Sequence, residues 1–252
     1  MDITQLPDEE IEKEYKRRQV RKDINLFIER VIKDEKGNRV KQATIHKIWQ
    51  AHIDWCKKNN RHAGILAPWG HGKTEQIAIA RPLWYLGHDQ NLRIKIVCNS
   101  DENAKARVAS IKRYIESDSD YREIFPEVLP DLKRYHAEKK RSEGEWSAHK
   151  IFIQRDAPSK DASVEAWGII SSGVGGRADI LIVDDPVDLR NAILEPAMRE
   201  KVKDAFKNIW LSRLVPDGFV IYIATVWHKN DLTMELLDNP TFSFLIMRIS
   251  ED

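Results

Sequence analysis

The residues with the clearest chemical potential lie in one segment, GILAPWGHGKT, from Gly64 to Thr74. Apolar residues at its start predict the end of a buried strand, and EQIAIARPLWYL after it predicts a helix. A glycine loop with Gly-Lys-Thr between a strand and a helix binds nucleotide phosphates, because backbone N–H groups there point at phosphate oxygens. The alternative is an ordinary strand-to-helix turn, since Ala67 stands where the usual pattern has its first glycine.

The phosphate-binding interpretation gives each loop residue a role. Lys73 is expected to reach the β- and γ-phosphates, and the Thr74 hydroxyl is expected to ligate Mg²⁺. The candidate phosphate-binding residues are Pro68, Trp69, Gly70, His71, Gly72, Lys73 and Thr74.

A second chemical group follows the apolar run at 180–183, where Asp184 and Asp185 precede a proline. Two adjacent carboxylates at the end of a buried strand are unfavourable unless they hold a cation or a proton. Ligands of open α/β sheets bind at that edge. We expect Asp184 to hold Mg²⁺, directly or through water, and Asp185 to orient and deprotonate an attacking water. The alternative is a solvated Asp-Asp-Pro turn.

Four further residues are candidates with open alternatives. Arg177 ends the glycine-rich loop SSGVGGR, where it either stabilises a transferred phosphoryl group or anchors the acidic strand end through a carboxylate. Thr225 follows a buried strand and is placed to sense the γ-phosphate, and His228 is expected to cap the next helix. Gln50 either hydrogen-bonds the adenine edge of ATP or is a surface amide.

The elements that must position these residues alternate between strands and helices. This pattern predicts an α/β fold, a P-loop NTPase core with a mainly parallel sheet flanked by helices, and an N-terminal helical arm. Residues 1–60 are expected to form the arm and a lid on the adenine side, and residues 61–252 the ATPase core. Helices are predicted over 6–34, 43–58, 75–86, 101–117, 196–215 and 231–240, strands over 93–99, 150–155, 164–170, 180–183, 219–225 and 241–249, and a loop over 131–146.

Composition limits the class of protein. The 252 residues contain 41 Lys and Arg against 40 Asp and Glu, so any contact with nucleic acid must come from a local patch. A charged run is usually a solvated helix face, and we expect this of the basic run Lys13 to Lys22. Two cysteines without metal-type spacing favour a reducing cytosolic setting, with Cys98 in the core. No apolar run approaches the roughly 18 residues of a membrane span, and the acidic N-terminus is unlike a signal peptide.

Three motifs, APWGHGKT, GGRADILIVDDP and TVWHKNDL, occur in this order. With them the chain, from about Thr44 onward, resembles the ATPase domain of the large terminase subunits of tailed bacteriophages, which are DNA-packaging motors. The resemblance implies an ATPase that uses ATP and Mg²⁺ to move double-stranded DNA into a procapsid in the host cytoplasm. It implies a ring of subunits, a pentamer in the family, with the portal protein and a small terminase subunit as partners. It places Gln50 in the adenine-binding motif and Thr225 in the segment that couples hydrolysis to DNA movement.

The chain departs from the family pattern at two positions. Family loops often carry an arginine where this chain has Trp69, so the search for an arginine finger moves to residues such as Arg177, supplied by a neighbouring subunit. In the family the acidic pair is often Asp-Glu, whereas in this chain it is Asp-Asp. The Asp185 side chain is shorter than the glutamate and must still reach the attacking water. Family members also carry a metal-dependent nuclease after the ATPase. The sequence ends at Asp252 without a second acidic cluster, so we expect an isolated ATPase domain without nuclease activity.

Other functions are weighed against the motor. A DNA-dependent ATPase of helicase type needs a second motor domain, and a nucleotide kinase has no place for the helical arm. A nucleotide-binding switch without turnover is disfavoured by the acidic pair. The basic residues available for DNA are Lys139, Lys140 and Arg141 and the run Lys13 to Lys22.

Overall fold

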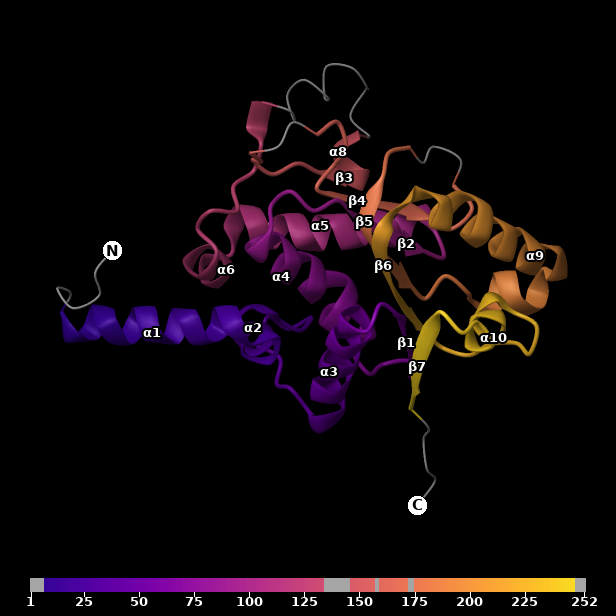
Figure 1. Cartoon of the computed structure of the whole chain (residues 1–252), viewed down its shortest axis with the longest axis horizontal. Coiled ribbons are helices and arrows are strands. Elements are labelled where there is room, and N and C mark those ends of the chain that lie inside the picture. Colours follow the sequence, from indigo (N-terminus) through magenta and orange to yellow (C-terminus); the bar gives the residue numbers. More distant parts are fainter. Residues whose placement is uncertain (1–6, 134–145, 157–158, 172–174, 248–252) are drawn as a thin grey trace.

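A mainly parallel sheet forms the centre of the computed structural model, which describes residues 7–133, 146–156, 159–171 and 175–247. Within these residues the sheet has seven strands in the order β3-β4-β2-β5-β6-β1-β7 (Figure 1). β3 pairs antiparallel with β4, and the other pairs are parallel, as predicted. The strands are β1 (His62–Leu66), β2 (Ile94–Cys98), β3 (Lys150–Ile151), β4 (Val164–Gly168), β5 (Ala178–Asp184), β6 (Leu214–Ala224) and β7 (Phe242–Ile246).

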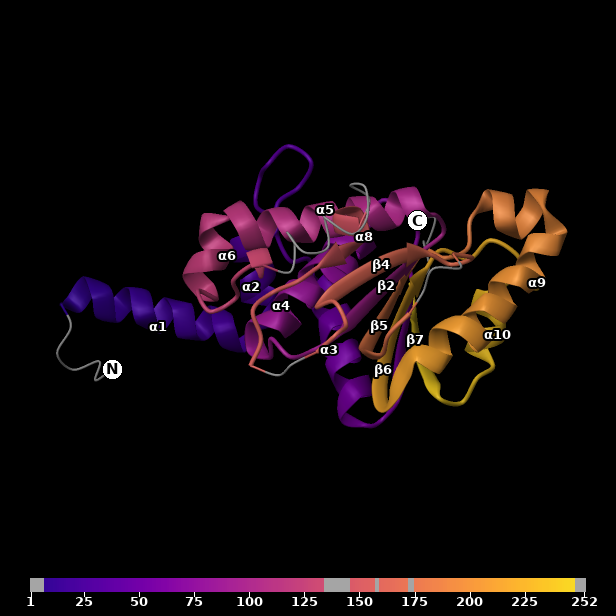
Figure 2. The same cartoon turned by 90° about the horizontal axis from the view of Figure 1, so that it is seen from above.

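Helices cover both faces of the sheet, and the alternation of side chains explains why (Figure 2). In β5, Ile180 and Ile182 enter one hydrophobic cluster, whereas Leu181 and Val183 enter the cluster on the other face. Both faces are therefore buried, which is why the strand is an unbroken apolar run. On the first face lie α2 (Ile24–Val31), α3 (Thr44–Lys58), α4 (Ala80–His88) and α5 (Asp101–Ser117), and on the second α9 (Pro196–Ala205), η4 (Phe206–Trp210) and α10 (Leu232–Leu237).

The N-terminal segment differs from the single helix predicted over 6–34. It forms α1 (Asp8–Lys22) and α2, which are separated at Asp23, whose side chain accepts from the Asn25 N–H and caps α2. α1 has no buried residue and projects away from the sheet (Figure 1). By contrast, Phe27 and Ile28 of α2 lie in the same cluster as the sheet. The predicted arm is therefore continuous with the core from α2 onward.

The boundary between α9 and β6 also differs from the prediction. The helical segment ends with η5 (Leu211–Arg213), and β6 begins at Leu214, so Pro216 to Gly218 lie inside the strand instead of ending a helix. The pairing with β5 shifts register there and becomes regular from Phe219, because proline has no N–H to donate. The remaining elements are η2 (Thr74–Ile79), α6 (Ser119–Ile124), α8 (Trp146–His149) and η3 (Arg190–Leu194).

Three central strands deliver the predicted site residues to one edge. β1, β6 and β5 are neighbours, with Leu66 opposite Ala224 and Asp184 opposite Ile223. Because the strands are parallel, the glycine loop, Thr225 and the acidic pair all follow their carboxyl ends. Among the described helices, none is both long enough and apolar enough to cross a lipid bilayer.

Candidate nucleotide-binding site

The loop after β1 needs glycine at two positions. Gly70 and Gly72 have φ angles of 81° and 72°, in the left-handed region that glycine adopts without strain. Ala67 lies outside that region and is buried, and its N–H donates to the Ala224 carbonyl at 3.2 Å, which continues the strand. Alanine therefore fits where the usual pattern has glycine.

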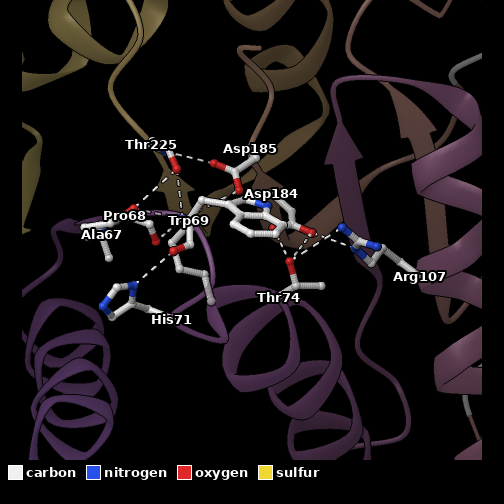
Figure 3. Close-up of polar contacts among 10 residues, drawn as sticks. Ala67, Pro68, Trp69, His71, Thr74, Arg107, Asp184, Asp185 and Thr225 are labelled. Atoms are coloured by element: carbon white, nitrogen blue, oxygen red, sulfur yellow. Dashed lines mark hydrogen bonds and ion pairs between the residues drawn. The ribbon is translucent and has the colours of Figure 1, made fainter. Parts of the chain in front are cut away.

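Two histidine rings hydrogen-bond to carbonyls of the loop after β1, one from α3 and one from the loop itself. Nε2 of His46 donates to the His71 carbonyl at 3.2 Å. Nδ1 of His71 donates to the Trp69 carbonyl at 3.1 Å (Figure 3). Burial lowers the pKa of His46, which favours the neutral ring. The Trp69 indole is 87% exposed. The predicted loop residues thus form one ordered turn with an aromatic side chain at its tip.

The helix after the loop begins with a short π-helix, η2, and continues as α4. No side chain caps its N-terminus, so the first backbone N–H groups remain available to an anion. π-Helical turns are often found at functional sites.

Lys73 lies folded onto its own loop. Its side chain is 4% exposed, and Nζ donates to the carbonyls of Ala67 at 2.8 Å and Pro68 at 3.1 Å and to Oγ1 of Thr225 at 2.9 Å. Oδ2 of Asp185 is 3.7 Å away. The ammonium group therefore already lies among residues of the predicted site, with four oxygens around it.

Thr74 and Asp184 meet as predicted for a shared metal. Oγ1 of Thr74 donates to Oδ1 of Asp184 at 3.1 Å, and Asp184 is only 1% exposed, so the solvated-turn alternative is wrong for this carboxylate. The described residues contain no group of three or more His, Cys, Asp or Glu that could hold a metal. A hydroxyl and one carboxylate nevertheless fit Mg²⁺, which takes its other oxygen ligands from phosphates and water.

A third residue at this position was not predicted. Arg107 of α5 donates from Nε to Oδ2 of Asp184 at 2.7 Å, and its Nη2 lies 3.5 Å from Oγ1 of Thr74 (Figure 3). No motif marks Arg107 in the sequence. Its place depends on which side of α5 faces β5, and that is set by packing.

Asp185 has an unusual backbone and a perturbed carboxyl group. Its φ is 45°, and Oδ1 accepts from the Thr225 N–H at 2.8 Å. Burial raises the pKa of Asp185, Lys73 opposes this, and the Asp184 charge adds to it. The side chain is 34% exposed, so one oxygen is fixed while the carboxyl remains accessible.

Gln50 is buried instead of being a surface amide, so that alternative is wrong. It is 1% exposed, its Nε2 donates to the Gln76 carbonyl at 3.1 Å, and its Oε1 accepts from Nε of Arg81 at 2.7 Å. Arg81 is fully buried and also donates to the Gln50 carbonyl at 2.8 Å. Gln50 thus joins α3 to the helix that follows the phosphate-binding loop.

Arg177 lies at the opposite end of β5 from the candidate site. It precedes β5, which spans seven residues, so about 20 Å separates it from Asp184 at the other end. The residue is exposed, and its backbone N–H donates to Asp161 at 3.1 Å. The alternative in which Arg177 anchors the acidic strand end is therefore wrong. Its side chain is also too far away to reach the candidate phosphate-binding loop of the same chain.

Two other predictions concern neighbouring segments. Asp231, not His228, caps α10, because its side chain accepts from the Met234 N–H at 3.1 Å. The His228 N–H donates to Oδ2 of the same aspartate at 3.0 Å.

Lys139, Lys140 and Arg141, suggested for DNA contact, lie outside the described residues. In the run Lys13 to Lys22, Lys16, Arg17 and Arg18 pair with glutamates of α1, as a solvated helix face does.

Comparison with known proteins gives a sequence relative and a fold relative. The chain is 31% identical over 179 residues to the terminase large subunit of Enterobacteria phage T3, a match that covers 70% of this chain and 28% of that protein. No family model matches. The large terminase of bacteriophage HK97 has the same fold, with a TM-score of 0.59 and 15% identity, over 92% of this chain and 44% of that one.

A further solved structure is less similar overall. The ATPase domain of the Thermus phage P74-26 large terminase has a TM-score of 0.48 and 14% identity, and 86% of each chain is covered. This chain therefore spans less than half the length of the T3 and HK97 proteins that it matches. The chain belongs to the large terminase subunits of bacteriophages, as the resemblance predicted: it is related to the phage T3 protein in sequence and shares the fold of the phage HK97 protein.

Proposed function

We propose that this chain is the ATP-hydrolysing part of a phage DNA-packaging motor, in which Mg²⁺-dependent hydrolysis drives double-stranded DNA into a procapsid. The observation that carries the ATPase proposal is the convergence of Lys73, Thr74, Asp184 and Asp185 at one sheet edge. The similarity to phage terminases supports the DNA part.

Phosphate binding uses groups that are already in place. The Lys73 ammonium exchanges its carbonyl contacts with Ala67 and Pro68 for oxygens of the β- and γ-phosphates. The residues from Pro68 to Thr74 surround those phosphates, and the uncapped helix N-terminus supplies N–H donors.

Thr74 and Asp184 are the residues that hold Mg²⁺ in this proposal. An ion held by these two residues would neutralise the negative charge that develops during phosphoryl transfer. Asp184 contributes a buried carboxylate, which Thr74 and Arg107 hold in position in the metal-free structure.

Asp185 is the proposed general base. The Thr225 N–H holds Oδ1, which leaves Oδ2 to accept a proton from the attacking water. Burial raises the pKa of this carboxyl, which makes it a better proton acceptor than an ordinary aspartate. Because aspartate is shorter than glutamate, the water must lie close to the end of β5.

Thr225, Gln50 and Arg177 complete the proposal. Thr225 contacts both Lys73 and Asp185, so loss of the γ-phosphate alters contacts of the segment after β6, which we propose couples hydrolysis to DNA movement. Gln50 can bind adenine only if its amide breaks the hydrogen bond to the Gln76 carbonyl and bonds to the base instead. Arg177 acts only on the site of a neighbouring subunit, which requires a ring, a pentamer by family resemblance.

The partners follow from the same resemblance. They are double-stranded DNA, the portal protein of the procapsid and a small terminase subunit, in the cytoplasm of the host cell. Contact with DNA should be independent of base sequence and should weaken steeply with salt, because it is made to phosphates.

Steady-state phosphate release tests the proposal. We expect turnover that requires Mg²⁺, rises with linear double-stranded DNA of any sequence, and is lost in Lys73→Ala. Lys58→Ala, at the exposed end of α3, is the matched control and should retain turnover. Equal turnover in Lys73→Ala and wild type would contradict the ATPase proposal, and turnover indifferent to DNA would contradict the motor.

A further inference from the structure

Arg107 is the residue at this site whose role the proposed hydrolysis does not explain. It comes from α5, not from the loops that follow β1, β5 and β6. Its guanidinium donates to Oδ2 of Asp184 at 2.7 Å and lies 3.5 Å from the Thr74 hydroxyl. Thr74 in turn donates to Oδ1 of Asp184 at 3.1 Å, so the three side chains contact one another.

The Asp184 carboxylate needs a cation because its side chain is fully buried. An unpaired carboxylate in such a place is strongly unfavourable. Among the described residues, Arg107 forms the ion pair with Asp184, whereas Lys73 lies beside Asp185. The guanidinium therefore supplies the positive charge at the oxygens that would otherwise hold a metal.

A divalent ion and the guanidinium compete for the same carboxylate. Mg²⁺ lies about 2.1 Å from its oxygen ligands. With Arg107 at 2.7 Å from Oδ2, both cations on Asp184 would be only a few ångströms apart and would repel each other. The Arg107 side chain is 23% exposed, so the guanidinium can move outward without opening the core.

We propose that Arg107 is an internal counter-ion that occupies Asp184 in the metal-free protein and is displaced when Mg²⁺ binds with the nucleotide. This inference rests on the proposed function, since it assumes that Thr74 and Asp184 hold the metal. Arg107 is then a positioning residue. It keeps both ligands together before the metal arrives, and it lowers the affinity of the site for the metal.

The test measures ADP affinity with a fluorescent ADP analogue, once in Mg²⁺ and once in EDTA. The dissociation constant in EDTA divided by the dissociation constant in Mg²⁺ isolates the contribution of the metal to ADP binding. The measurement needs no turnover. We expect Arg107→Ala to raise this ratio about tenfold, since a charge-assisted hydrogen bond no longer has to be broken. Arg107→Gln, which keeps N–H donors but loses the charge, should raise it in the same direction. Arg113→Ala, an exposed arginine on the same helix, should leave it unchanged.

The outcomes separate this inference from the proposed function. If wild type binds no ADP in either condition, or Asp184→Asn keeps the wild-type ratio, the nucleotide and metal site itself is wrong. If wild type shows a metal-dependent ratio and both Arg107 variants leave it unchanged or lower it, only the counter-ion role is wrong. Thermal unfolding in EDTA provides a second readout, in which Arg107→Ala should unfold earlier than wild type and regain part of the loss with Mg²⁺ and ADP.

Discussion

The backbone N–H of Thr225 donates to Oδ1 of Asp185 at 2.8 Å, and the hydroxyl of Thr225 accepts from Nζ of Lys73 at 2.9 Å. One residue at the end of β6 therefore contacts both the lysine proposed to bind phosphate and the aspartate proposed to activate water. In the proposed function, a change at the γ-phosphate would reach the segment after β6 through these two hydrogen bonds of a single residue.

The loop glycines should be sensitive to substitution for conformational reasons. Gly72 has a φ of 72°, and an added Cβ would meet Cγ of Gln76 at 3.9 Å, so space is available and the backbone is the obstacle. We expect Gly72→Ala to lower the free energy of unfolding by about 1–2 kcal/mol and to weaken nucleotide binding. Denaturant unfolding and ADP titration measure the two effects.

The matched control for that prediction is Ala67→Gly. Because Ala67 lies outside the left-handed region, restoring the glycine of the usual pattern should destabilise the chain by less than about 1 kcal/mol. It should leave nucleotide affinity unchanged. Tighter nucleotide binding in Ala67→Gly would show that the alanine distorts the loop, against the geometry described above.

Gln50 should matter for stability. Gln50→Ala leaves Nε of the buried Arg81 and the Gln76 carbonyl without their partner, which should lower the free energy of unfolding by about 1–3 kcal/mol. The adenine proposal also expects a smaller preference for ATP over GTP in this variant. Competition binding with the two nucleotides measures that preference, and an unchanged preference would restrict Gln50 to holding α3 against the loop helix.

The sequence was sufficient to predict the parts of the site that local patterns control. The loop, the acidic pair and Thr225 each follow an apolar run, and parallel strands bring such residues to one edge. The same reasoning could have placed Arg177 correctly. The apolar run at 180–183 already separates it from Asp184, and the carboxyl end of a strand cannot adjoin the residue before its start.

Other features depend on contacts that no local pattern carries. Arg107 reaches Asp184 because α5 packs over β2 and β4, which fixes the side of the helix that faces β5. Gln50 appears polar in sequence and is nevertheless buried, because Arg81 and Gln76 satisfy its amide. The early start of β6 at Leu214 depends on pairing with Ala178 of β5, despite the proline and glycine that predicted a helix end there.

The Asp185 carboxyl should make the free energy of unfolding fall as pH rises. Burial raises its pKa although Lys73 opposes this, so the folded chain binds the proton more tightly than the unfolded chain does. The stability that this proton contributes is present at low pH and is lost as pH rises above the ordinary aspartate value of about 4. We therefore expect Asp185→Asn to gain stability relative to wild type between pH 4 and pH 7 in the absence of nucleotide.

Asp179 provides a control of opposite sign. Burial alone would raise the pKa of Asp179, but hydrogen bonds from Arg93 outweigh burial and lower it. The contribution of this carboxylate to stability is therefore present at neutral pH and lost in acid. Asp179→Asn should accordingly lose stability relative to wild type as pH rises. Denaturant unfolding from about pH 2 to about pH 7 covers the acid range of Asp179 as well as the range of Asp185, and a parallel response of the two variants would contradict the assignment for Asp185.

Arg177 should act between subunits if it acts in catalysis at all. The ATPase rate per subunit should rise with protein concentration in wild type, because a neighbour must supply the guanidinium. In Arg177→Ala that rise should disappear, whereas Arg113→Ala should behave as wild type. A rate per subunit that is independent of concentration and of the Arg177 substitution would leave this arginine without a catalytic role.

The most direct test of the central claim compares binding and hydrolysis of Mg²⁺-ATP in one preparation of Asp185→Asn. Asparagine keeps the acceptor for the Thr225 N–H and tolerates the left-handed backbone at this position, so the site should remain assembled. The account predicts ATP affinity close to that of wild type together with hydrolysis slower by about 10²–10⁴-fold, the usual contribution of a general base. Hydrolysis at the wild-type rate in this variant would contradict the assignment of Asp185 as the base that activates water.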